Sequence, residues 1–494
     1  MSRINTNIQS LVARRALALN NNSLQQSLER LSTGLRINTG KDDPAGLIAS
    51  ETLRAGIRAI STAISNAERA DTIVNVAEGG LQEISSLLLD LENLIDQTAN
   101  EAGLTPEEIS ANQLQIDSIL QSIDRLAEAT AFGNKKLLNG SLDFTTSGVN
   151  IDESTGTALT DLDRVQINAA KVPAGSFRQV NVNVVAGSEF AYISALGAGT
   201  DGGGSLDGTL AAATTIQVRG NFGSDIISFA SGATAVQIAA AVNGSKELTG
   251  VSATASAATG GATSVVFQST GFGADAFVSV SVLENLTAFS SQAANATDYG
   301  VDGTVTVNGA NAIVRGLDAS VRTGGLSLDL TLTPTFGGTA GGTTSFEITG
   351  GGAIFSISPT VSLSGQETIG VTEVSSAKLG STGTGYLATL KSGLANDLSS
   401  KNFASAQRIV REAINQVASL RGRLGSFQKD TLTTTINSLR VARENVTAAE
   451  SAIRDADFAA ETSNLTRAQI LVNSSTAILQ IANAAPQNVL ALLG

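Results

Sequence analysis

The sequence predicts an α+β protein: a long antiparallel α-helical coiled-coil rod from paired N- and C-terminal segments, with an inserted β-rich middle region. Apolar residues recur at helical spacing in residues 1–139 and again from about residue 385. Between them the chain is rich in Gly, Ala, Thr, Ser and Val. From Ser141 to Gly380 there are 19 acidic and 8 basic residues, so this region holds most of the net charge of −13. The nearly neutral ends can pack against copies of themselves, whereas an acidic middle tolerates solvent.

The first predicted helix lies in residues 1–43. Its leucines at 17, 24 and 31 are seven residues apart, which is the spacing of a coiled-coil seam. Gly34 and Gly40 are expected to end it. The next predicted segment is the N-terminal rod, 44–140.

The second helix has the longest regular pattern in the chain and is expected from Leu47 to about Glu101. Asp43 can cap it, and Pro44 occupies the first helical position, where proline is favoured. A helix of this length requires a packing partner. Its heptad residues lie seven positions, or about two helical turns, apart. They are Leu53, Ile60, Ala67, Val74, Leu81, Leu88 and Ile95.

A third helix and a C-terminal partner complete the predicted rod. Thr105, Pro106 and Glu108 form a capping-box pattern before the apolar stripe of the third helix. The C-terminal rod, 385–455, is expected to pack through heptad residues that continue after a slip in register beyond Leu424. These residues are Val410, Val417 and Leu424, then Leu432 and Leu439.

The middle region, 141–384, is predicted to form one or two β-rich subdomains. Short runs rich in β-branched residues, such as TTIQVRG, TSVVFQS and LSLDLTLTP, are separated by glycines. One helix, TAVQIAAAVNG, interrupts them, with Thr234 as its cap.

The C-terminal tail, within 456–494, carries no charged residue from Ala468 to Gly494. Such a tail cannot cover its own apolar face, so we expect it to be disordered in a monomer and ordered on assembly. Its predicted stripe contains Leu471, Ile478 and Leu492, with Ile481 beside it, and the matching N-terminal stripe contains Ile4, Ile8, Leu11 and Leu17.

Composition excludes most catalytic chemistry. The chain has no His and no Cys, so Ser-His-Asp, Cys-His and HExxH zinc sites cannot form. We therefore predict no enzyme activity, no metal and no cofactor. A net acidic chain without basic, aromatic clusters is not expected to bind nucleic acid or an anionic membrane. The sequence contains no run of ~20 apolar residues, so it predicts no membrane-spanning helix. Arg14 and Arg15 interrupt the apolar core that a secretory signal would need.

Both ends of the sequence resemble bacterial flagellins. The opening MSRINTNIQSLVARRALALNNNSLQQSLERLSTGLRINTGKDDPAGLIASETLRAGIR looks like a flagellin start, and ESAIRDADFAAETSNLTRAQILVNSSTAILQIANAAPQNVLALLG looks like its end. Residues about 214–283 resemble a repeat found inside flagellins and hook-associated proteins. The resemblance implies a filament subunit whose termini form an inner tube and whose variable middle projects to solvent.

The resemblance also implies partners and a location. We expect a homo-polymer in the extracellular bacterial flagellum, exported unfolded through the flagellar channel without a cleaved signal peptide. An export chaperone on the C-terminal tail, a filament cap protein and a hook–filament junction protein are the partners it implies.

One segment departs from the family's pattern. Many flagellins are bound by an innate receptor of vertebrates through the stretch that matches LLLDLENLIDQTAN, and that pattern carries arginines where this chain has Asp90 and Glu92. Reversing charge in a buried contact costs several kcal/mol. We therefore expect this protein to be a weak or silent agonist.

Other functions remain compatible with some of these sequence features. A hook–filament junction protein would share the termini, although the opening RINTN and the ending PQNVLALLG resemble true flagellins. An adhesive outer region would need aromatic platforms, and the chain has no Trp and three Tyr. O-linked sugars on the Ser- and Thr-rich middle are a further hypothesis that the sequence cannot place.

Overall fold

The structure is a computed structural model that divides into two compact units. The terminal unit comprises Met1–Arg69, Ser356–Gly365 and Lys429–Gly494, and the central unit comprises Ala70–Phe355 and Gln366–Gln428. Residues whose structure is described are 6–100, 103–148, 161–173, 175–196, 210, 212–257, 263–284 and 296–491.

The terminal unit is built from helices whose ends follow the predicted signals. Asn7 caps α1 (Ile8–Thr33), and Gly34 ends it in the left-handed conformation with φ 73°. Asp43 Oδ1 accepts from the Gly46 amide at 2.8 Å at the start of α2 (Pro44–Thr98), as its capping role predicts. Helices α8 (Thr434–Arg454) and α9 (Phe458–Ala491) complete this unit.

Ion pairs align α8 antiparallel to the first half of α2. Arg440 pairs with Glu68 at 2.9 Å, and Arg454 pairs with Glu51 at 2.8 Å. Although Leu439 lies on the predicted stripe, it is only half-buried, as is Leu53, and no residue of α8 is fully buried. On the α2 side, by contrast, Ile60, Ile64 and Ala67 are buried.

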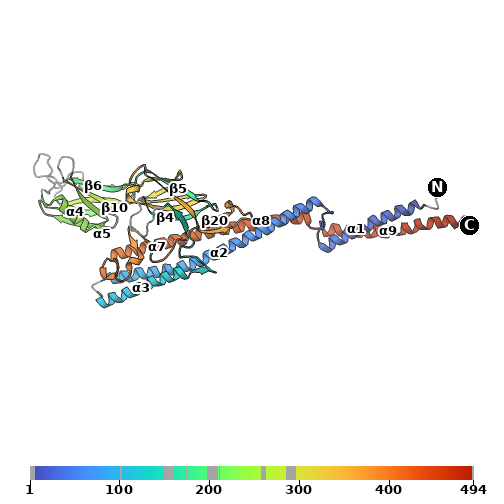
Figure 1. Cartoon of the computed structure of the whole chain (residues 1–494), viewed down its shortest axis with the longest axis horizontal. Helices are drawn as coiled ribbons and strands as arrows, with labels where there is room; N and C mark the ends of the chain where they lie inside the picture. Colours follow the sequence, from blue (N-terminus) through green and yellow to red (C-terminus); the bar gives the residue numbers. More distant parts are fainter. Residues whose placement is uncertain are drawn as a thin grey trace. The chain divides into compact units, whose positions relative to one another are not determined.

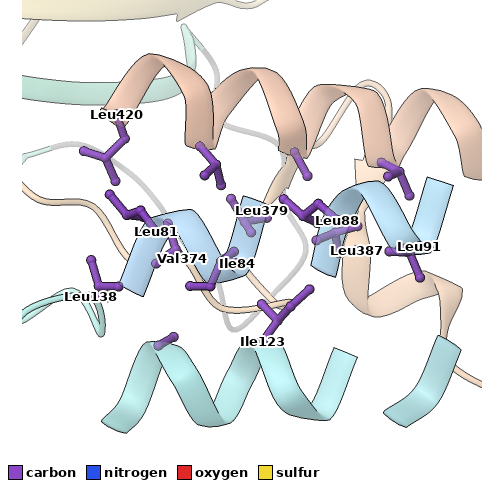
Figure 2. Packing of buried hydrophobic residues seen from close by; sticks show 14 of the residues in the cluster. Leu81, Ile84, Leu88, Leu91, Ile123, Leu138, Val374, Leu379, Leu387 and Leu420 are labelled. Atoms are coloured by element: carbon purple, nitrogen blue, oxygen red, sulfur yellow. The ribbon is translucent and has the colours of Figure 1, made fainter. Parts of the chain in front are cut away.

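The helical core of the central unit lies between α2, α3 (Pro106–Ala129) and α7 (Phe403–Ser426). Leu81, Ile84, Leu88 and Leu91 of α2 meet Ile123 of α3 and Leu420 of α7 (Figure 2). The return segment adds Val374, Leu379 and Leu387 to the same core. The heptad residues Val74, Ile95, Val410, Val417 and Leu424 are also buried there, with exposures of 3% or less.

Polar contacts set the directions of these helices. The predicted capping box of Thr105 and Glu108 is present at the start of α3. Pairs between Glu92 and Arg411 and between Glu78 and Arg421, at 2.7 and 2.8 Å, show that α7 runs antiparallel to α2. Figure 1 shows α3 and α7 alongside α2.

A π-helical segment, Phe427–Thr433, joins α7 to α8. A π turn holds one more residue than an α turn, so it shifts the register by about one position. The spacing of eight between Leu424 and Leu432 is thereby accommodated, and both leucines stay buried. This is the physical cause of the slip predicted from the heptads.

A β-sandwich forms the part of the middle region nearest in sequence to the rod segments. One sheet has strand order β14-β13-β5-β18-β3 and the other β15-β16-β17-β4, and their inner faces share a core rich in Val and Leu. The strands are β3 (Phe144–Ser147), β4 (Leu162–Ala170), β5 (Arg178–Ala186), β13 (Thr304–Val307), β14 (Ala310–Asn311), β15 (Ile313–Arg315), β16 (Asp318–Thr323), β17 (Leu326–Leu332) and β18 (Thr343–Gly351). The short helix α6 (Pro334–Gly337) follows β17.

A second β-rich core contains the segment predicted as a repeat. Sheets β6-β10-β9 and β12-β11-β7-β8 enclose it with α4, whose Thr234 cap forms a capping box with Gln237. The elements are β6 (Phe190–Leu196), β7 (Thr214–Arg219), β8 (Ser224–Phe229), α4 (Ala235–Gly244), α5 (Lys246–Thr249), β9 (Val251–Ala257), β10 (Thr263–Phe272), β11 (Phe277–Glu284) and β12 (Ala296–Tyr299). Strands β6 and β12 lie outside residues 214–283, so the two sheets are completed by strands from either side of the repeat.

Short elements connect the sandwich to the helices. They are β1 (Ala131–Phe132), β2 (Lys135–Lys136), β19 (Ala353–Ser356), β20 (Gln366–Ile369), β21 (Gly380–Ser381) and β22 (Gly385–Tyr386), with single 3-10 turns at Leu363–Gly365, Leu387–Leu390 and Leu398–Ser400. The predicted α+β class is confirmed, and the runs predicted as strands are strands.

Candidate functional site

Helices α1 and α9 bring the two ends of the chain together. Asn7 Nδ2 donates to the Ala482 carbonyl at 2.7 Å, Asn20 Nδ2 donates to Ser475 Oγ at 2.6 Å, and Arg30 lies 3.8 Å from Glu461. Residue numbers rise along α1 as they fall along α9, so the pair is antiparallel. Figure 1 shows the two helices side by side, with the start of α1 and the end of α9 at the same end of the pair.

The contact between these helices is a heptad seam with alternating spacings of three and four. On α1, the half-buried leucines at 17, 24 and 31 alternate with small or polar residues, among them Ala13, Asn20 and Ser27. On α9, Leu465, Val472 and Leu479 alternate in the same way with Ala468, Ser475 and Ala482. The large apolar side chains of this seam are half-buried, and its fully buried residues are small or polar: Ala13, Ser27, Ala468, Ser475 and Ala482.

Apolar side chains also lie outside the seam, and we call this set the outer apolar residues. Each has 45% or more of its surface exposed, which is unusual for so many aliphatic side chains in one helix pair. They are Ile8, Leu11, Val12, Leu19, Leu28, Ile470, Leu471, Ile478 and Ile481.

The predicted assembly residues are thus divided between two faces. Leu17, Leu24 and Leu31 lie in the seam, whereas Ile8, Leu11, Leu471, Ile478 and Ile481 belong to the outer apolar residues. Ile4 and Leu492 lie outside the described residues. The sequence reasoning missed Leu465, Val472 and Leu479, although they repeat every seven residues as Leu471 and Ile478 do.

One expectation about the tail was wrong. The tail was expected to be disordered in a single chain, but α9 is helical to Ala491. The reason is the seam, because pairing along α1 gives the tail hydrogen bonds and partial burial within one subunit.

A compact joint links the helix pair to the start of the rod. The Arg36 amide donates to the Arg454 carbonyl at 2.7 Å, and its guanidinium donates to the Ile453 carbonyl at 2.6 Å. Arg454 and Arg54 both pair with Glu51, and their hydrogen bonds hold the pKa of this carboxyl below its usual value. These contacts fix where each terminal segment leaves the joint.

Known proteins match this arrangement at both ends. The profile described as the bacterial flagellin N-terminal helical region matches residues 4–143, and that of the C-terminal helical region matches residues 408–493. Flagellin C of Vibrio cholerae is 27% identical over 99% of this chain and 99% of its own. Flagellin E of the same species is 40% identical over 32% of this chain and 40% of its own.

The chain belongs to the bacterial flagellin family. It is a structural subunit of the extracellular flagellar filament and not an enzyme. This function agrees with a site made of apolar helix faces. No group of three or more acidic side chains suited to a metal ion occurs in the described ranges. Within them, no helix is both long and apolar enough to cross a membrane.

Solved structures of related flagellar parts are more distant. Flagellar hook associated protein-3 from Legionella pneumophila is 14% identical, with a TM-score of 0.27, and the match covers 84% of this chain and 99% of that one. The D1-D2-D3 domains of the flagellar cap protein FliD from Escherichia coli are 15% identical, with a TM-score of 0.26 over 55% and 62%. At these TM-scores the similarity supports no conclusion about this flagellin.

The two acidic residues that the sequence analysis singled out, Asp90 and Glu92, lie on α2. Asp90 is exposed, whereas Glu92 Oε1 accepts from Arg411 Nε at 2.7 Å. This hydrogen bond raises the pKa of Arg411 above its usual value. Glu92 is therefore paired with Arg411, and an arginine at position 92 would repel Arg411.

A polar pocket lies where the chain leaves the helical bundle for the β-sandwich. It has a volume of about 380 Å³, and its lining includes Asp143 and Glu373. Burial raises the pKa of Asp143 to about 6, against the opposing pull of the Phe144 amide and of Arg423. Burial also lowers the pKa of Arg423 to about 10, and its guanidinium nitrogens have no hydrogen-bond partner.

Proposed function

We propose that the α1–α9 pair is the polymerisation element of this flagellin and that its outer apolar residues pack against neighbouring subunits. The observation that supports this is the division of apolar side chains between two faces. The seam accounts for the pairing within one chain, but it leaves side chains such as Ile478 and Ile481 exposed at 58% and 72%. Burying several of them at ~25 cal/mol per Å² contributes several kcal/mol per subunit.

The repeated contact is head to tail. A surface that meets a different surface on the next copy does not close on itself, so it extends into a helical tube. Residues 1–43 and 456–494 would form the inner tube, and the α2–α8 segment and the α2–α3–α7 bundle would form the rod around it. This division follows the predicted boundaries at 140, 384 and 455.

The same exposed surface suggests what binds the chain before assembly. An export chaperone on the C-terminal tail would cover the outer apolar residues of α9 until the subunit reaches the growing end. We further propose export through the flagellar channel without a cleaved signal peptide. A cap protein at the tip and a hook–filament junction protein at the base would then contact these helix faces.

Seeded polymerisation tests the assembly surface. Full-length chain and a chain lacking Ala468–Gly494 are added to filament seeds, then pelleted and imaged by electron microscopy, and we expect only the full chain to elongate. The sharper variant is Ile481→Asp. Its matched control is Ile313→Asp, because Ile313 on β15 is 73% exposed and receives the same charge.

The expected result is loss of elongation for Ile481→Asp alone, with unchanged circular dichroism in both variants. Equal elongation by the deletion and the full chain would remove the basis of the proposal. If none of the folded chains elongates seeds, the proposal of an assembling tail fails and a junction role gains support.

We also propose that this flagellin is a weak or silent agonist of the innate flagellin receptor of vertebrates, because Asp90 and Glu92 carry the opposite charge to the family's pattern. A receptor-reporter assay compares the chain with its Asp90→Arg, Glu92→Arg double variant. We expect the double variant to be more potent, and wild-type potency equal to that of an arginine-bearing flagellin would contradict the proposal.

A further inference from the structure

A loop of the middle region belongs to the terminal unit rather than to the β-sandwich. It is Ser356–Gly365, between β19 and β20, and we call it the arm. Asn66 Nδ2 on α2 donates to the Ser356 carbonyl at 3.2 Å. The arm is thus attached to the first half of the long helix.

Hydrogen bonds within the arm give it a defined shape. The Ile357 amide donates to the Gly365 carbonyl at 3.2 Å, and the Gly365 amide donates to the Ser362 carbonyl at 3.0 Å. The hydroxyls of Ser362 and Ser364 lie 3.0 Å apart, and Ile357 is only 5% exposed. The base of the arm is therefore buried, and hydrogen bonds close its turn.

The tip of this ordered loop is apolar. Val361 is 92% exposed and Leu363 is 40% exposed. No charged residue occurs from Ile354 to Gln366, in a chain with a net charge of −13. Ordering a loop costs conformational entropy. A valine that stays exposed to water gains no burial free energy within one subunit to offset this cost.

We infer that the arm is a contact between subunits and that its apolar tip packs against a second copy of this chain. This inference rests on the proposed assembly function. Identical acidic subunits repel each other, so they approach most closely through uncharged surfaces. The arm is such a surface, and it belongs to the same compact unit as the α1–α9 pair. Its occupant is therefore another subunit rather than an anionic membrane or a basic partner.

Cross-linking from the tip tests the contact directly. The chain has no cysteine, so Val361→Cys can be labelled at a single position with a benzophenone maleimide. Val236→Cys is the control, because Val236 on α4 is also exposed, at 66%. After illumination of filaments, we expect covalent dimers from position 361 and none from position 236, and monomers should give no dimers. Cross-links that stay within one chain, or equal dimer yields at both positions, would overturn the inference.

A charge at the tip tests the energy of the contact. Val361→Asp is expected to raise the critical concentration of seeded polymerisation about tenfold, which corresponds to ~1.4 kcal/mol. Val236→Asp should leave it unchanged, and thermal unfolding of both monomers should match wild type. If wild-type chain elongates seeds and Val361→Asp does so at the same concentration, the arm inference fails while the assembly function stands. If wild-type chain does not elongate seeds, the assembly function fails, and the inference fails with it.

Discussion

The α1–α9 pair and the α2–α3–α7 bundle both carry apolar residues at heptad spacing, but they bury these residues to different extents. In the bundle, Leu81, Leu88 and Leu91 have no exposed surface, and three helices plus the return segment cover them. In the pair, the seam leucines are half-buried and the outer apolar residues are open to solvent. The comparison indicates that apolar periodicity alone does not make a core. A third partner must cover the remaining face, and we propose that in the pair this partner is another subunit.

The largest effect is expected when one aliphatic side chain is truncated in the bundle, and the same kind of truncation in the helix pair provides the comparison. Leu88→Ala should lower the free energy of unfolding of the monomer by ~3 kcal/mol, because it leaves a cavity in a closed core. Ile478→Ala should leave monomer stability within ~0.5 kcal/mol of wild type and weaken polymerisation instead. Urea unfolding and the critical concentration measure the two quantities. A monomer equally destabilised by both variants would mean that the pair already has a closed core.

The second prediction concerns the polar pocket of the central unit. The folded chain holds the pKa of Asp143 at about 6, above the usual 3.8, so the folded state binds more protons than the unfolded state between these pH values. Stability from this group is therefore full below about pH 4 and is lost as pH rises through 6. Asp143→Asn should be more stable than wild type at pH 7.5, by at most ~3 kcal/mol.

The difference between these two proteins should shrink at pH 4, where Asp143 of the wild type is largely protonated in the folded state and partly protonated in the unfolded state. Urea midpoints at the two pH values test this, because all other groups titrate in both proteins. A less stable Asp143→Asn variant at pH 7.5 would mean that attraction from Arg423 outweighs the cost of burial.

The smallest effect is expected on the surface of the rod. Glu92→Arg replaces the ion pair with Arg411 by repulsion, and because Arg411 is 60% exposed, we expect a loss of only ~1 kcal/mol in unfolding free energy. Asp90→Arg is the control, since Asp90 is exposed and has the same charge. A loss that persists in 1 M salt would argue against an electrostatic cause, because salt screens exposed pairs.

Much of the fold could be predicted because its signals are local. Thr105 and Glu108 form the expected capping box, and the spacing of eight between Leu424 and Leu432 marks the π-helical segment. Strands β4, β5 and β6 were missed. In β5, Val180, Val182 and Val184 alternate with polar residues, so this strand could have been recognised from its pattern. Strand β6 pairs with β10, more than sixty residues later in the chain.

The sequence by itself determined that this chain has long amphipathic ends, a β-rich acidic middle and no histidine or cysteine for catalysis. It could not choose between the two heptad rows of α9, Leu465–Val472–Leu479 and Leu471–Ile478, because periodicity defines the rows of a helix but not which row meets a partner. The tertiary structure decided this by pairing α9 with α1 through the first row, which leaves the second row exposed. It also decided the burial of Asp143 and the exposure of Val361, since both depend on where distant segments of the chain come together.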